Sequence, residues 1–255
     1  MKLFYKKSGA GKPFIILHGL FGSLDNWQSV GKQLSENFEV YLADQRNHGH
    51  SPHSETWNYK VMSDDLHELI MDNNLDKIIL AGHSMGGKTA MQFASEHPEV
   101  IDKLIVIDIA PKAYPVLHSS VIEALQAVNL DVIQSRKEAE EILNAKIPDI
   151  ATRQFLLKNL YWLDADAKKL AWRFNFEAIR KNIEMVGQKI TIENFNKLTL
   201  FMRGEHSNYI SKIDWVEIQQ KFTAAELVTI PNAGHWIHAD QPQAFLDTIL
   251  DFCRK

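Results

Sequence analysis

Short apolar runs alternate with longer amphipathic segments over the first 110 residues. Near-continuous apolar runs are typical of strands buried on both faces of a sheet, and they occur at 13–17, 38–43, 78–80 and 103–109. Apolar residues spaced every three or four positions indicate helices, and this spacing covers 25–36, 59–73 and 88–96. A shorter run at 3–7 predicts an edge strand. The alternation predicts an α/β fold with a mostly parallel central sheet and helices on both faces.

The alternation stops near residue 111. Up to residue 197 the chain shows helical periods, at 116–128, 135–145, 149–160 and 175–185, with an extended piece at 170–174. Strand-like runs resume at 198–202 and 226–230, and a last helix is expected at 242–252. We therefore expect a core formed by residues 1–110 and 197–255, into which a helical cap of residues 111–196 is inserted.

Composition and charge narrow the class of protein. The chain has 255 residues, of which 45% are hydrophobic and 24% charged, and its net charge is −4 without a basic stripe, which argues against nucleic-acid binding. No apolar run approaches the roughly 18 residues that a membrane span needs, and the N-terminus lacks signal-peptide features. The single cysteine, Cys253, can form no internal disulfide. We expect a cytoplasmic protein that acts on a small molecule; its oligomeric state is left open.

A glycine-flanked serine is the first candidate for chemistry. Gly82-His83-Ser84-Met85-Gly86 lies between the apolar run 78–80 and the predicted helix 88–96. A sharp strand-to-helix turn strains the serine and brings its neighbours close to adjacent strands, so glycines are needed on either side. The pattern predicts that Ser84 is a nucleophile.

A serine hydroxyl needs a base, usually histidine, and the histidine needs a carboxylate. His235 is the best candidate for the base, because Pro231 to Trp236 forms a loop between the last predicted strand and the last helix. This places His235 at the carboxyl edge of the sheet, where Ser84 also lies and where open α/β sheets bind ligands.

Five motifs resemble those of the α/β-hydrolase fold, and most specifically the YbfF type of bacterial esterase. They are His18–Asn26, Asp44–Gly49, Gly82–Lys88, Ile107–Pro111 and Gly234–Trp236. The resemblance implies a sheet of about eight strands, a cap inserted after the sixth strand, and a serine esterase that needs no cofactor. It also implies that Arg46-Asn47-His48-Gly49 is a structural turn rather than a metal site.

The carboxylate of the triad is ambiguous. The fold usually carries it after the strand that precedes the histidine strand, but Ser207 occupies the expected position. Asp108, at the end of the strand after the nucleophile strand, is an alternative that the fold uses, and a carboxylate among apolar residues needs a partner. We therefore favour Asp108, with Glu205 and then Asp214 as alternatives. Ser207 would then support the histidine or the acid.

Ester hydrolysis also needs two backbone amides that stabilise the oxyanion. Met85 follows the nucleophile and would supply one, and the loop after His18 would supply the other, from Leu20 or Phe21. The flanking His18 and His83 are expected to be supports. The aromatics Trp162, Trp172 and Phe174 are expected to form cap core rather than a substrate cage.

The motifs predict a serine hydrolase that cleaves carboxylic esters through an acyl-enzyme. Hydrolysis of thioesters or of carbon–carbon bonds would use the same residues, and these alternatives stay open. A ligand-binding receptor that retains the fold is the non-enzyme alternative.

Overall fold

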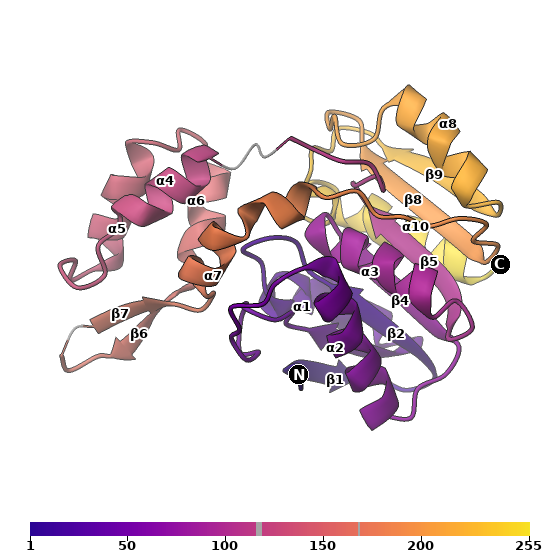
Figure 1. Ribbon diagram of the computed structural model, residues 1–255, viewed down its shortest axis with the longest axis horizontal. Helices are drawn as coiled ribbons and strands as arrows, with labels where there is room; N and C mark the ends of the chain where they lie inside the picture. The colour runs from indigo at the N-terminus through magenta and orange to yellow at the C-terminus, as the bar shows by residue number, and fades with distance from the viewer. Residues whose placement is uncertain (116–118, 168) are drawn as a thin grey trace.

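A mostly parallel sheet forms the centre of the protein (Figure 1). The structure is a computed structural model that describes residues 1–115, 119–167 and 169–255. Over these residues the main sheet has seven strands in the order β1-β3-β2-β4-β5-β8-β9, and only β1 runs antiparallel to its neighbour. The strands are β1 (Tyr5–Ser8), β2 (Lys12–Leu17), β3 (Phe38–Ala43), β4 (Ile78–His83), β5 (Ile101–Ile107), β8 (Leu198–Gly204) and β9 (Ala225–Ile230). The predicted fold class is confirmed.

Consecutive residues of the central strands belong to two different cores. Ile15 and Leu17 of β2 pack into one core, whereas Phe14 and Ile16 pack into the other. Side chains alternate between the two faces of a strand, so a strand that is apolar at every position buries both faces. The near-continuous apolar runs in the sequence have this physical cause.

Helices cover both faces of the sheet (Figure 1). The short turn η1 (Leu24–Trp27), α1 (Gln28–Leu34) and α10 (Pro242–Cys253) contribute to the core that contains Phe14. The opposite core receives α2 (Tyr59–Asp72), α3 (Met85–Glu96) and α8 (Lys212–Lys221). A further short helix, α9 (Ile237–Asp240), follows the loop of His235. The helix α8 was not predicted from the sequence.

The segment between β5 and β8 lies to one side of the sheet (left in Figure 1). It contains α4 (Ser119–Ala127), α5 (Arg136–Asn144), α6 (Ile150–Leu157), β6 (Leu160–Asp164), β7 (Lys169–Trp172), α7 (Phe176–Lys181) and the turn η2 (Ile183–Gly187). We call residues 111–196 the cap. Residues 116–118 of the helix predicted at 116–128 lie outside the described residues.

Two details of the predicted architecture differ from the structure. The cap is not purely helical, because β6 and β7 pair as an antiparallel hairpin. Of the two strands, only the extended piece at 170–174 was expected. Strand β6 was not predicted, because Leu160 is its one fully buried residue and the strand therefore has no alternating pattern. The described sheet also has seven strands rather than about eight, so the cap follows the fifth strand, β5, and not a sixth. The exact division into core and cap residues stays a prediction.

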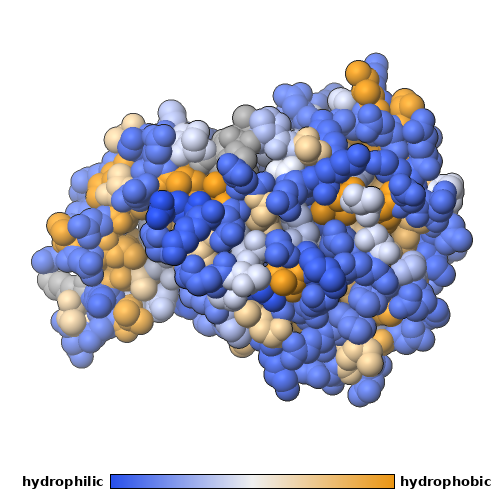
Figure 2. Space-filling model, in the orientation of Figure 1, coloured by the Kyte–Doolittle hydropathy of each residue, from blue (hydrophilic) through white to orange (hydrophobic). Residues whose placement is uncertain are grey.

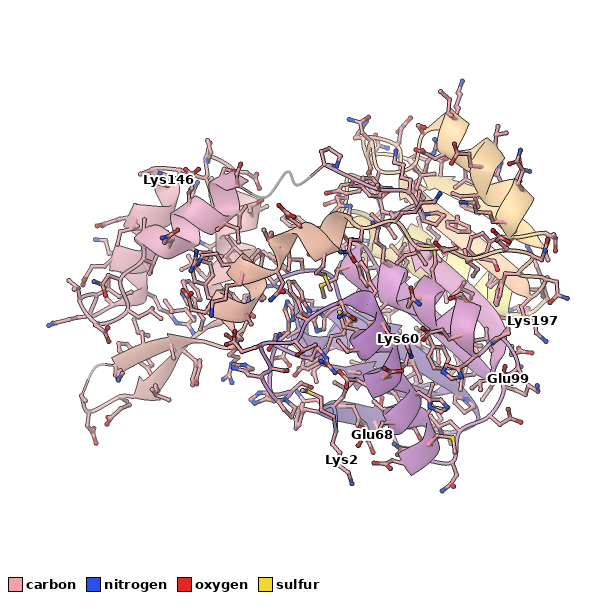
Figure 3. All side chains as sticks on the ribbon, in the orientation of Figure 1. Lys2, Lys60, Glu68, Glu99, Lys146 and Lys197 are labelled. Carbon is pink, nitrogen blue, oxygen red and sulfur yellow. The ribbon has the colours of Figure 1, made fainter. Side chains whose placement is uncertain are left out.

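The face of the molecule seen in Figure 2 is largely hydrophilic. Lys60 and Glu68 on α2 and Lys146 in the cap project outward in Figure 3, while Figure 2 shows apolar patches over the cap at the left. Exposed apolar side chains of the cap include Val132 and Leu163. Within the described ranges, no helix is both long and apolar enough to cross a membrane.

Candidate active site

Ser84 lies at a sharp turn between β4 and α3. Every residue of β4 is buried, and the helix begins at Met85, directly after the serine. The Ser84 backbone has φ 52° and ψ −116°, a conformation that L-residues rarely adopt. Such strain costs on the order of 1–3 kcal/mol and persists only where surrounding structure enforces it. Here the Ser84 amide donates to Ile107 O at 3.0 Å, which ties the turn to β5.

Two glycines make this turn possible. A Cβ on Gly82 would lie 2.2 Å from Gly86 O, and a Cβ on Gly86 would lie 2.5 Å from Leu17 O. Both contacts would be with backbone oxygens and are much shorter than a van der Waals contact. No rotation of a side chain could relieve them. The two glycines of the motif therefore let the turn pack against itself and against β2, as the sequence pattern predicts.

Asp108 and His235 meet at the carboxyl edge of the sheet. Asp108 follows β5, and His235 lies in the loop after β9. The His235 Nδ1 is 2.7 Å from Asp108 Oδ2, and the Asp108 side chain is fully buried. An ionised carboxylate accepts, so the Nδ1–H donates and the lone pair is left on Nε2. Nε2 has no hydrogen-bond partner in the described parts of the chain.

The last residue of β8 and the loop that follows it complete the surroundings of Asp108. The Gly204 amide donates to Asp108 Oδ1 at 3.2 Å, and the Ser207 hydroxyl donates to Asp108 Oδ2. A buried carboxylate needs such donors, because an unpaired charge in the interior is strongly destabilising. Ser207, which replaces the expected acid, thus lies beside Asp108.

The alternative acids point elsewhere. Glu205 accepts from the Asn232 amide at 2.9 Å. Asp214 caps α8 through Ser211 and pairs with Lys112, 2.7 Å away. Neither carboxylate contacts His235, whereas Asp108 does.

The loop after β2 carries the two candidate amides for the oxyanion, and they differ. The Phe21 amide donates to His48 Nε2 at 3.2 Å and is therefore occupied. Burial lowers the pKa of His48 to about 3, which keeps the ring neutral and its Nε2 able to accept, while its Nδ1–H donates to Arg46 O. The amides of Leu20 and Met85 donate to no acceptor within the described residues.

His18 and His83 are buried supports. The Gln45 amide donates to His18 Nε2 at 2.9 Å, and His18 Nδ1 donates to Gly19 O. His83 Nε2 donates to His235 O at 2.8 Å, which fixes the backbone that carries the candidate base. Burial holds the pKa of both rings below the usual histidine range. Both rings are therefore neutral at neutral pH.

Two side chains near His235 were not singled out in the sequence. Tyr209 stacks on the His235 ring with centroids 4.1 Å apart and planes 21° apart. His238 stacks on Trp27 at 4.1 Å, and burial lowers its pKa to about 4. No local pattern predicts the Tyr209 contact, because it joins two loops that follow different strands.

A cavity of about 640 Å³ opens over Ser84 and His235. The core contributes Leu20, Trp27 and Trp236 to its wall, and the cap contributes Val121, Phe155 and Leu156. Drug-sized ligands bind in cavities of this volume, which are mostly apolar with a few polar groups. The space is shaped jointly by core and cap, and it contains the candidate nucleophile and base.

Two of the three cap aromatics singled out in the sequence are buried in the hydrophobic core, and the third is not. Trp172 and Phe174 are buried and stack with ring centroids 5.2 Å apart. Trp162 is 42% exposed and does not line the cavity. In the described part of the chain, no group of three or more His, Cys, Asp or Glu residues is arranged to hold a metal ion.

Known proteins resemble this chain along most of its length. The pattern of the alpha/beta hydrolase fold family matches residues 12–242. Over 254 residues the chain is 39% identical to the sn-1-specific diacylglycerol lipase of Danio rerio, an alignment that covers 96% of this chain and 79% of that protein. Esterase YbfF of Escherichia coli (strain K12) is 34% identical over 238 residues, covering 93% of this chain and 91% of the relative.

A solved structure resembles the whole architecture. A marine microorganism esterase superposes with a TM-score of 0.94 and 44% sequence identity, covering 98% of this chain and 99% of the other. The similarity therefore includes the cap as well as the sheet.

Proposed function

The chain belongs to the α/β-hydrolase fold family and is an esterase-type hydrolase, and on this premise we propose that Ser84, His235 and Asp108 are its catalytic triad. The observation that carries the proposal is the contact between the buried Asp108 and His235, 2.7 Å apart, whose histidine lines the same cavity as the strained Ser84. Asp108 fixes the tautomer in which Nε2 can accept a proton. The resemblance predicted from the motifs is confirmed at the level of the family.

In the proposed reaction His235 Nε2 takes the hydroxyl proton of Ser84 as its oxygen attacks the ester carbonyl carbon. The carbonyl oxygen becomes an oxyanion, and the Leu20 and Met85 amides donate to it. Removing one such donor typically costs about 3 kcal/mol of transition-state stabilisation. The C–O bond then breaks as His235 returns the proton to the leaving alcohol, and an acyl-enzyme remains. Water repeats the sequence, which releases the carboxylic acid and restores Ser84.

Ser207 supports the acid in this scheme. Its hydroxyl donates to the same Asp108 oxygen that accepts from His235, so it helps to hold that oxygen toward the imidazole. Phe21 is excluded from the oxyanion role in this proposal because its amide is held by His48.

For the substrate, we propose a carboxylic ester with an apolar acyl chain. Its support is the cavity wall, to which both cap and core contribute aromatic and aliphatic side chains such as Phe155, Leu156 and Trp236. Among the relatives, a diacylglycerol lipase and esterases carry names compatible with such substrates. The cytoplasmic location stays a prediction.

Replacing Ser84 tests the proposal. Ser84→Ala should lower kcat for p-nitrophenyl butyrate by about 10⁴- to 10⁶-fold, as in other serine triads, and should abolish covalent labelling by a fluorophosphonate. Ser95→Ala is the matched control, because Ser95 lies at the far end of the same helix and donates only to Gln92 O. Hydrolysis and labelling that survive in Ser84→Ala would refute the assignment.

A further inference from the structure

The chain enters and leaves the cap through two adjacent segments, 111–114 and 186–190, which we call the cap stem. The Tyr114 amide donates to Gly187 O at 2.8 Å, and the Ile190 amide donates to Pro111 O at 2.8 Å. A Cβ on Gly187 would lie 2.3 Å from Tyr114 O, so the two segments are packed without space between them. The stem is therefore one unit rather than two separate linkers.

Lys88 fastens the stem to the helix that begins after the nucleophile. It is fully buried on α3, and its Nζ donates to Lys112 O in the first stem segment and to Gln188 O in the second. The same Nζ lies 4.8 Å from the centre of the Tyr114 ring, within cation–π distance. Tyr114 is thus held by its backbone bond to Gly187 and by the contact of its ring with Lys88.

The Tyr114 hydroxyl reaches from the stem to the active-site loops. It accepts from the Ala110 amide at 2.8 Å, two residues after Asp108, and donates to Tyr209 O at 2.6 Å. Burial raises the pKa of Tyr114 above its usual range, so the hydroxyl keeps its proton and remains a donor. One hydroxyl thereby joins the loop after β5 to the loop after β8.

Tyr209 is held at both of its backbone groups. Its carbonyl accepts from Tyr114, and its amide donates to Ser207 Oγ at 3.3 Å. Its ring lies against His235 with planes 21° apart. A ring in this position restricts the imidazole to one plane and attracts its cationic form, which develops when the histidine takes a proton.

We propose that Tyr114 is a positioning residue for His235 and that it acts through Tyr209. The cap stem then takes part in orienting the base, even though no atom of the stem is among those that react. This inference rests on the proposed role of His235 as general base. It adds a connection between the place where the cap is attached and the efficiency of proton transfer.

The first test is a kinetic comparison with p-nitrophenyl butyrate. Tyr114→Phe removes the hydroxyl and keeps the ring, so kcat should fall about 10-fold because the base is less well oriented, while KM stays within about twofold. Tyr59→Phe is the matched control: it removes another buried hydroxyl that bonds to the stem, at Val186 O, but does not reach Tyr209. Its kcat should stay within about twofold of wild type.

A double-mutant cycle separates a path through Tyr209 from a general loss of stability. Tyr209→Leu should lower kcat about as much as Tyr114→Phe, and the double variant should be no slower than Tyr209→Leu alone. Tyr209→Phe retains the ring and should recover most of the kcat lost in Tyr209→Leu. Thermal unfolding of each variant establishes that it is folded at the assay temperature.

Three outcomes would overturn the inference: losses that multiply in the double variant, a change confined to KM, or an undiminished kcat in Tyr209→Leu. The last result decides the matter even where Tyr114→Phe does not fold. Fluorophosphonate labelling of wild type at Ser84 keeps this inference separate from the proposed function. A wild type that is not labelled refutes the function, whereas a labelled wild type with multiplying losses refutes only the role of Tyr114.

Discussion

The core and the cap differ in how completely their elements are buried. In the core, β2, β4 and β5 are buried on both faces and end at the loops of Leu20, Ser84 and Asp108. In the cap, the short helices α4 and α6 contribute to the cavity wall, and the hairpin strand β6 is mostly exposed. The comparison teaches that the candidate catalytic residues lie at strand ends with little freedom, whereas the cavity wall includes cap elements that bury only one face.

Apart from the loss expected in Ser84→Ala, the largest expected effect is also on the core side. Asp108→Asn should lower kcat about 10⁴-fold, because an amide at this position favours the wrong histidine tautomer. Steady-state kinetics with p-nitrophenyl butyrate measure this loss. If Asp108→Asn retained near-wild-type activity, the role of the acid would pass to another carboxylate and the contrast between core and cap would weaken.

The free energy of unfolding should depend on pH through Lys88, which binds the cap stem to the core. Burial lowers the pKa of Lys88 to about 7 from the ordinary lysine value of 10.5. Between these values the unfolded chain binds more protons than the folded one, so the free energy of unfolding should rise with pH over this window, by about 5 kcal/mol in total. The gain in stability is complete near pH 10.5, the pKa of lysine in the unfolded chain, and it is lost as the pH falls toward 7.

Urea unfolding from pH 7 to 10 measures that rise in wild type and in Lys88→Met, which should lack it. Lys60→Met is the matched control, because Lys60 is 60% exposed on the neighbouring helix α2. Equal pH slopes in wild type and Lys88→Met would show that Lys88 does not change its protonation on unfolding.

A smaller effect is expected where the cap lines the cavity. Phe155 faces Trp236 of the core with ring centroids 5.3 Å apart. Phe155→Ala should lower kcat/KM for a long-chain p-nitrophenyl ester about 10-fold, and that for the acetate much less, because only a long chain would contact the ring. Trp162→Ala, in the same cap but outside the cavity, is the control. Equal losses for both esters would mean that Phe155 does not select for chain length.

The smallest effect is expected at the rejected acid. Glu205→Gln should change kcat less than about twofold, because its side chain accepts from Asn232 and lies away from His235. The kcat of Glu205→Gln is measured with p-nitrophenyl butyrate in the same assay as that of Asp108→Asn, so that the two carboxylates are compared directly. A loss of several orders of magnitude in Glu205→Gln would reverse the assignment of the acid.

Much of the core could be predicted because its constraints are local. Ser84 is flanked by glycines that the turn requires, and His235 follows the last strand of the sheet. The choice between Leu20 and Phe21 could not be made in this way, since it depends on a bond from Phe21 to His48, which lies after a different strand.

The elements that were missed lack a periodic pattern. Helix α8 exposes Ile213 and Val216 while it buries Ile218, so its apolar residues do not share one face. Strand β6 buries only Leu160 fully. Both elements are determined by packing against distant parts of the chain, which no window of sequence contains.

Two contacts join the cap to the loop that carries Leu20 and Phe21. Asn159 of the cap donates to Phe21 O at 2.8 Å, and Phe174 packs against the Phe21 ring with centroids 5.0 Å apart. Phe21 has φ 57° and adjoins Leu20, so its backbone direction affects where the Leu20 amide points. Replacing the cap with that of a relative would therefore also change the candidate oxyanion loop, unless the new cap supplies its own partners for Phe21.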